Sequence, residues 1–132
     1  MKTKPCLTLD DAKKMAAACE AEAVKNKWNV AIAISDDGGH LLWLARMDGA
    51  TPANVDIALG KCRTAALSRR PSKMWEDRIA GGRLSMLSMP LLAVQGGMPV
   101  SFQGEHVGAI GVSGVQSHED EQIANAGIAA LG

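Results

Sequence analysis

The first amphipathic pattern of the chain predicts a helix from Leu9 to about Asn26. Apolar residues recur there every three or four positions with lysines and glutamates between them, which is the spacing of one helix face. Thr8 stands at the expected N-cap, and Asp11 follows three residues later as its capping partner.

The next segment, residues 30–45, has the pattern of a β-hairpin. Val30, Ile32 and Ile34 alternate with small alanines, a pattern typical of a strand that is buried on both faces. Residues 36–40 read Asp-Asp-Gly-Gly-His and favour a tight turn, so the apolar run 41–45 is expected to pair back on the first strand.

Helical spacing returns twice in the middle of the chain. Thr51 and Pro52 are the expected cap and first residue of a second helix that runs to about Arg69. A shorter helix is expected from residue 70 to 79, ended by the glycines at 81 and 82. The apolar segment 84–94 has no clear period and is expected to be irregular, with one helical turn at most.

The last third predicts another hairpin and a final helix. The runs 98–102 and 107–112 flank a turn at residues 103–105. Ser117, with Asp120 three residues on, is the expected cap of the last helix. Tightly connected strands imply an antiparallel sheet of about four to five strands with helices packed on it, hence an α+β domain that spans residues 1–132.

Composition narrows the functional classes. Fourteen basic and fourteen acidic residues give a formal net charge of zero, so neither nucleic acid nor a membrane surface is an expected partner. No secretion signal or membrane-spanning segment is apparent, and three widely spaced cysteines suit reduced thiols, so the expected location is the cytoplasm. The small, alanine-rich core favours self-association.

Single motifs in the sequence point to no reaction. The glycines 108, 111 and 114 do not have the spacing of a nucleotide-binding loop and are expected to be structural. The three histidines lack metal-ligand spacing, so no metal site is expected, although folding could bring His40 and His106 together. No acid–base pair can be named from spacing alone, and the catalytic residues stay unknown.

Two groups of residues leave a functional interpretation open. Lys61 and Thr64 lie one helical turn apart and, with Arg46 nearby, can present a cation and a hydroxyl to an acidic ligand; a solvated helix face is the alternative. Methionines gather in the irregular middle of the chain, which suits a hydrophobic pocket, a subunit interface or plain core filling.

Taken together, the motifs resemble the GlcG/HbpS-like family over nearly the whole chain. The resemblance rests on residues 45–49 (ARMDG), Lys61, Thr64-Ala65, residues 96–100 (GGMPV), residues 104–114 (GEHVGAIGVSG), Asp120 and Ala124. It implies a profilin-like three-layer fold, assembly as a dimer, tetramer or octamer, and a small-molecule-binding module of catabolic metabolism.

The resemblance also implies a ligand site between helix and sheet. It marks nine positions as lining or shaping that site: Arg46, Asp48, Lys61, Thr64, Gly97, Pro99, Gly111, Ser113 and Gly114. Some relatives bind heme, which makes heme a candidate cofactor. Relatives can ligate its iron through a histidine of the first helix, and that helix contains none here.

Two functions of different classes follow. The first is a binding protein whose ligand is an organic acid, an aromatic metabolite or a tetrapyrrole such as heme or a corrinoid. The alternative is a small catabolic enzyme of the isomerase, hydratase or lyase type, with Lys61 as proton shuttle or electrophile in an oxo-acid or aromatic-metabolite pocket. The catalytic alternative requires a buried lysine or one with a cation beside it.

Overall fold

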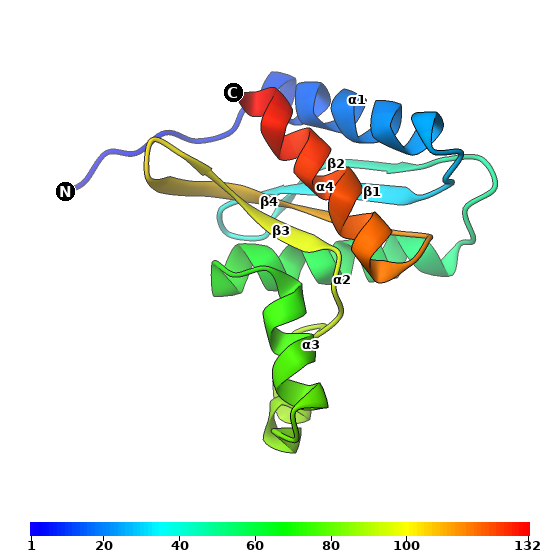
Figure 1. The fold of residues 1–132 in the computed structure, drawn as a ribbon. Helices are drawn as coiled ribbons and strands as arrows, with labels where there is room; N and C mark the ends of the chain where they lie inside the picture. The colour runs from blue at the N-terminus through cyan, green and yellow to red at the C-terminus, as the bar shows by residue number, and fades with distance from the viewer.

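The computed structural model describes all residues from 1 to 132, and its elements follow the predicted order (Figure 1). In chain order they are α1 Leu9–Lys25, β1 Ala31–Asp36, β2 Leu41–Arg46, α2 Ala53–Ser68, α3 Ser72–Ala80, the 3-10 turn η1 Leu84–Ser88, β3 Gly97–Phe102, β4 Glu105–Ser113 and α4 Ser117–Leu131.

The four strands form one antiparallel sheet in the order β2-β1-β4-β3. Helices α1 and α4 cover one face of this sheet and α2 covers the other (Figure 1). The predicted three-layer α+β fold is confirmed, with four strands. The central strand β1 is buried on both faces, as its alternation of branched residues and alanines predicted.

The helix caps confirm one prediction and correct two. Thr8 and Asp11 form the predicted capping box of α1. At α4 the predicted pair Ser117 and Asp120 is wrong: the capping box is formed one residue earlier, by Gln116 and Glu119. At α2 the cap position is Pro52 and not Thr51, and no side chain caps it.

The two faces of the sheet carry different cores. Towards α1 and α4 the sheet presents branched aliphatic side chains, among them Ile32, Ile34 and Ile110. Towards α2 it presents alanine and glycine. The side chains that α2 packs against them are also small: Ala58, Cys62, Ala65 and Ala66. Small side chains on both sides let the α2 backbone approach the sheet closely.

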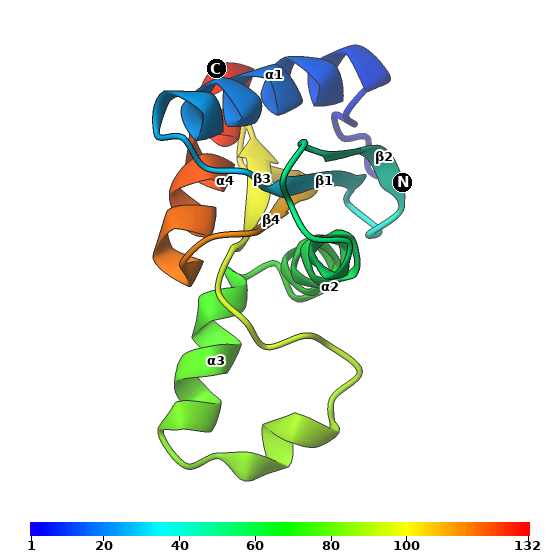
Figure 2. The same cartoon turned by 90° about the vertical axis from the view of Figure 1, so that its right-hand side faces the viewer.

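Residues 71–95 leave this layered body as an arm. Figure 2 shows α3, η1 and the returning loop projecting away from α2 and the sheet. Hydrogen bonds fix the root of the arm to the body. The Ser72 hydroxyl accepts from the Gly97 N–H at 2.8 Å, the Trp75 ring N–H donates to Ser68 at 3.1 Å, and the Thr64 hydroxyl lies 2.8 Å from the Leu92 carbonyl oxygen. At the other end the Gln95 amide donates to Glu121 at 2.8 Å. The outer part of the arm packs on itself.

Candidate functional site

Lys61, the cation predicted to face a ligand, is buried and paired. Its side chain is 2% exposed, and Nζ lies 3.0 Å from Oδ2 of Asp120 and 3.0 Å from the carbonyl oxygen of Val112, to which it donates. Burial raises the pKa of the Asp120 carboxyl, while the charge of Lys61 opposes this shift. The pair joins α2 to the first turn of α4, two helices on opposite faces of the sheet.

Gly96, just before β3, and Gly97, its first residue, are required by Lys61. Gly96 has φ +130°, and a Cβ there would lie 2.8 Å from the Lys61 ammonium nitrogen and 2.7 Å from the Val112 carbonyl oxygen. A Cβ on Gly97 would overlap the backbone carbonyl of Lys61. One glycine therefore admits the lysine side chain and the other admits its helix backbone, so this part of the family pattern has a packing explanation.

The other predicted positions fall into two groups. Thr64 is fully buried on α2, with its hydroxyl 2.8 Å from the Leu92 carbonyl oxygen. Gly111 lies under α2, where a Cβ would overlap the Ala58 carbonyl and the Cys62 N–H. Ser113 is also buried, and its hydroxyl donates to Asn54 Oδ1 at 2.8 Å near the start of α2. The remaining positions lie nearer the surface: Arg46, Asp48 and Gly114 are exposed and Pro99 is half-buried.

Two cavities open on the protein, and neither is lined by any of the nine predicted positions. Their role as ligand contacts stays a prediction. Of the two conditions named for the catalytic alternative, burial of Lys61 is met, whereas the group beside it is a carboxylate and not a cation. Lys61 lines neither cavity, so a catalytic role of this residue stays a prediction.

The larger cavity lies within the arm and has a volume of about 400 Å³. Its walls are almost wholly apolar, with one carboxylate: Glu76, Ile79, Ala80, Met86, Leu87, Leu91, Leu92, Ala93 and Val94. The volume is within the range of small-molecule sites, which are typically lined by apolar side chains with a few polar groups. The sequence pattern pointed to this region only through its methionines, because an irregular segment has no periodicity that reveals an inward face.

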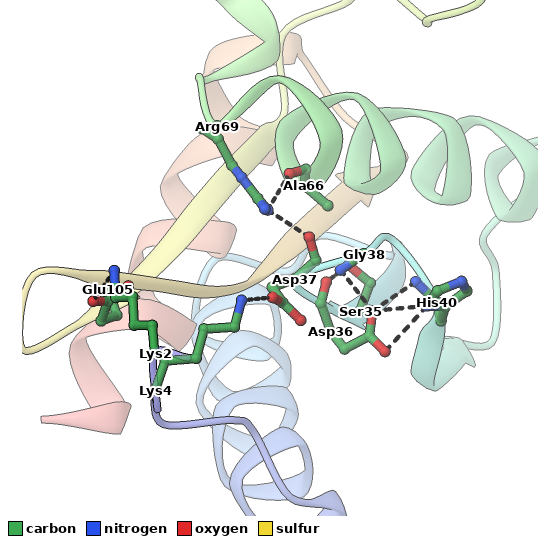
Figure 3. A network of polar contacts seen from close by, with 10 residues as sticks. All are labelled: Lys2, Lys4, Ser35, Asp36, Asp37, Gly38, His40, Ala66, Arg69 and Glu105. Atoms are coloured by element: carbon green, nitrogen blue, oxygen red, sulfur yellow. Dashed lines mark hydrogen bonds and ion pairs between the residues drawn. The ribbon is translucent and has the colours of Figure 1, made fainter.

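The smaller cavity, of about 220 Å³, lies between the N-terminal segment, the β3–β4 hairpin and the end of α4. Beside it the N-terminal segment is held by ion pairs (Figure 3). Lys2 pairs with Glu105 at 2.6 Å, and Lys4 pairs with Asp37. Asp37 also receives a hydrogen bond from the Arg69 guanidinium on its backbone carbonyl, so one turn residue anchors both the N-terminal segment and the end of α2.

The histidines and buried cysteines offer no reactive cluster. His40 is exposed and bound to Asp36, and His106 is half-buried with no partner for Nε2. No group of three or more His, Cys, Asp or Glu side chains is placed to hold a metal ion. Burial raises the pKa of Cys19 to about 12 and that of Cys62 to about 11, so both thiols are protonated at neutral pH. None of the helices is long and apolar enough to cross a membrane.

Comparison with known proteins assigns the family. A family model described as "Haem degrading protein HbpS-like" matches residues 7–129. The chain belongs to the HbpS-like family. Protein GlcG of Escherichia coli (strain K12) is 47% identical over 114 residues, which cover 86% of this chain and 85% of GlcG. The family resemblance seen in the sequence is thereby confirmed.

Solved structures agree with this assignment. The crystal structure of Klebsiella pneumoniae protein ORFY superposes with a TM-score of 0.92 at 28% identity and covers 99% of this chain and 94% of ORFY. The crystal structure of a PduOC:heme complex superposes with a TM-score of 0.86 at 25% identity, over 96% of this chain and 95% of PduOC. Family membership and this heme-bound neighbour support a small-molecule-binding protein.

The walls of the arm cavity are apolar, as a macrocycle requires, and they offer one donor for heme iron. Protein ligands of heme iron are His, Cys, Met or Tyr, and Met86 is the only such residue that lines the cavity. The histidines line neither cavity, and α1 contains none. Apolar side chains would therefore hold the macrocycle and Met86 would hold the iron. A bound heme would supply iron redox chemistry and a strong visible absorption.

Proposed function

We propose that this HbpS-like protein binds a small, mostly apolar molecule in the arm cavity. The observation that carries the proposal is a cavity of about 400 Å³ whose walls are eight apolar side chains and one carboxylate. Burying apolar ligand surface contributes about 25 cal/mol per Å², so such walls favour a flat or bulky apolar ligand over a small polar one.

The charge of the cavity walls ranks the three ligand classes suggested by the sequence, namely an organic acid, an aromatic metabolite and a tetrapyrrole. Its one charged lining residue is Glu76, an acid without an ion-pair partner, and no cation lines the walls. A small organic acid would meet like charge there and gain little apolar contact. A tetrapyrrole or an aromatic metabolite can bury its ring against the walls and leave its acidic groups at the open mouth. The heme complex of PduOC supports the tetrapyrrole within this pair.

Titration of the purified protein with three probes tests the proposal. Hemin, iron-free protoporphyrin IX and glycolate represent a heme, an apolar macrocycle and a small organic acid. We expect both macrocycles to saturate at one equivalent per subunit and glycolate to show no saturable binding. Saturable glycolate binding without macrocycle binding would overturn the proposal.

Two variants locate the site. Ile79→Glu places a charge on the cavity wall and is expected to weaken macrocycle binding at least tenfold, whereas Val24→Glu, on the exposed side of α1, is the matched control. Met86→Leu keeps the wall apolar but removes the sulfur. It should change the Soret band of bound hemin and leave protoporphyrin affinity unchanged. Equal affinities for the Ile79 and Val24 variants would place the site elsewhere.

A further inference from the structure

The smaller cavity, of about 220 Å³, is a hollow that the proposed function does not use. Four parts of the chain form its walls: residues 5–7 before α1, Asp11 in the first turn of α1, Phe102 and Val107 of the β3–β4 hairpin, and Leu131 at the end of α4. Asp11 is the only acid or base among them besides the thiol of Cys6. Mostly apolar walls with a single charged group are typical of a site for a small organic molecule.

The size of this cavity limits the ligands that it can hold. An apolar cavity of about 150 Å³ is enough to bind benzene. A volume of about 220 Å³ therefore has room for one aromatic ring with a short chain, and it lies below the usual range of about 300 to 1,000 Å³ for larger ligands. The ligand that fits is much smaller than a tetrapyrrole.

The floor of the cavity is part of the folded core. Leu7 is 9% exposed and Val107 is 2% exposed, and both belong to the main apolar cluster. A Cβ on Gly108 would lie 2.6 Å from Cδ1 of Leu7, so this glycine leaves room for the leucine against the sheet. Because the floor is formed before any ligand enters, binding requires little ordering of the protein on this side.

The outer wall belongs to the N-terminal segment and is held less firmly. No backbone hydrogen bond joins residues 1–7 to the rest of the chain. The ion pairs of Lys2 with Glu105 and of Lys4 with Asp37 hold this segment instead (Figure 3). Exposed ion pairs contribute little to stability, so the outer wall can move aside to admit a ligand while the floor stays in place.

Asp11 determines the charge that a ligand meets in this cavity. Its Oδ2 accepts hydrogen bonds from the backbone N–H of Thr8 at 2.8 Å and from the Thr8 hydroxyl at 2.9 Å, and no hydrogen bond of the protein reaches Oδ1. These two bonds hold the pKa of Asp11 below its ordinary value. Lys14 acts in the same direction but does not line the cavity. The apolar walls therefore carry one ionised carboxylate with a free acceptor oxygen.

We propose that the smaller cavity binds a primary amine that carries one aromatic ring. The ring lies against Leu7, Val107 and the ring of Phe102, and the ammonium donates a hydrogen bond to Oδ1 of Asp11. A ligand of the same shape with a carboxylate would meet like charge, and no cation lines the walls to compensate it. The site is separate from the arm cavity, and it does not depend on the function proposed there.

Isothermal titration calorimetry of the full-length protein with three probes of one shape tests this proposal. Phenethylamine, 2-phenylethanol and 3-phenylpropionate share a phenyl ring on a two-carbon chain and differ in the charge at its end. We expect phenethylamine to bind at one equivalent per subunit, 2-phenylethanol to bind about tenfold more weakly, and 3-phenylpropionate not to saturate. No saturable binding of phenethylamine, or equally tight binding of either other probe, overturns the proposal.

Two neighbouring substitutions assign the binding to Asp11. Asp11→Asn keeps the size of the side chain and should weaken phenethylamine binding about tenfold, while the affinity for 2-phenylethanol stays the same and shows that the cavity is intact. Asp10→Asn is the matched control, because Asp10 lies in the same helical turn but is exposed and does not line the cavity. Equal phenethylamine affinities for these two variants place the amine elsewhere and overturn the proposal.

The thiol of Cys6 reports occupancy of the cavity by an independent route. Cys6 lies in the outer wall and is the only exposed cysteine, since Cys19 and Cys62 are buried. Saturating phenethylamine should slow its reaction with N-ethylmaleimide severalfold. The control is the double variant Cys6→Ser, Val24→Cys, which moves the exposed thiol to the outer side of α1 and should react at an unchanged rate. A Cys6 rate that phenethylamine does not change overturns the proposal.

Discussion

The two faces of the sheet meet their helices in opposite ways. Against α2 the contact is made by alanines and glycines, and backbone lies close to backbone. Against α1 and α4 the space is filled by isoleucines, valines and Met15. Protein interiors are packed about as densely as organic crystals, so the first face cannot accept an added atom and the second cannot lose one without leaving a void.

The largest loss in the free energy of unfolding is expected at the Lys61–Asp120 pair, which joins the helices on the two faces of the sheet. Asp120→Ala removes the partner of the Lys61 ammonium, which then stays buried without a counter-charge. Breaking a buried ion pair in this way typically costs about 3 to 5 kcal/mol. Urea unfolding followed by circular dichroism measures this loss.

An exposed pair of the same type provides the control. Lys73 and Asp77 lie four residues apart on the surface of α3, and Asp77→Ala should lower the free energy of unfolding far less than Asp120→Ala, because water screens exposed charges. Equal costs for Asp77→Ala and Asp120→Ala would show that Lys61 and Asp120 do not form a buried pair.

The second largest loss in the free energy of unfolding is expected where the sheet packs against α2. Gly111→Ala adds one methyl group, which overlaps the Ala58 carbonyl and the Cys62 N–H, two backbone groups that cannot rotate away. We expect a loss of about 3 kcal/mol in the free energy of unfolding. Gly81→Ala is the matched change: its φ is −77°, and its Cβ would lie 3.3 Å from the Asp77 carbonyl oxygen, against 2.2 Å from the Ala58 carbonyl oxygen at Gly111. It should therefore cost much less than Gly111→Ala.

Ile32 and Ala33, neighbours on β1 that face opposite sides of the sheet, allow the two faces to be compared directly. Ile32→Val removes one methylene from the α1 and α4 side and should cost about 1 kcal/mol, the usual value for this substitution in a core. Ala33→Val adds two methyl groups on the α2 side and should cost more, about 2 kcal/mol, although valine is the better strand former. A smaller loss for Ala33→Val than for Ile32→Val in the same unfolding assay would contradict the distinction between the faces.

The sequence alone predicts the secondary-structure elements but not the contacts between distant residues. Element types were predictable because β1 alternates branched residues with alanines and because α1 carries its capping box, and both signals are local. The pairing of Lys61 with Asp120 was not, since it joins residues 59 positions apart and depends on how β4 and α4 are placed.

The error at the start of α4 has the same origin. Ser117 with Asp120 and Gln116 with Glu119 both have the spacing of a capping box, and only the folded chain shows that Asp120 is already engaged by Lys61 and by the Val115 N–H. The arm cavity escaped prediction for a different reason: its lining residues belong to a segment with no helical or strand period, so no pattern shows which side faces inward.

The smallest change in the free energy of unfolding is expected for His106, at the edge of the sheet face that α2 covers. Its side chain is half-buried near Arg69, Lys4 and Asp37. Burial lowers its pKa below 6.5, and Arg69 and Lys4 act in the same direction while Asp37 opposes them. As the pH falls below about 6.5 the unfolded chain takes up this proton before the folded one, so the free energy of unfolding should decrease towards the folded pKa and then level off.

The variant His106→Gln isolates this contribution, because it removes the titrating group and keeps a polar side chain in β4. The stability difference between wild type and variant should be constant above about pH 6.5 and should shift in favour of the variant at lower pH. A difference that stays flat down to about pH 5 would mean that His106 titrates alike in the folded and unfolded chain. In that case the uncompensated Nε2 does not lie in a desolvated position, and the rim of the α2 face is more open to water than the sheet beneath the helix.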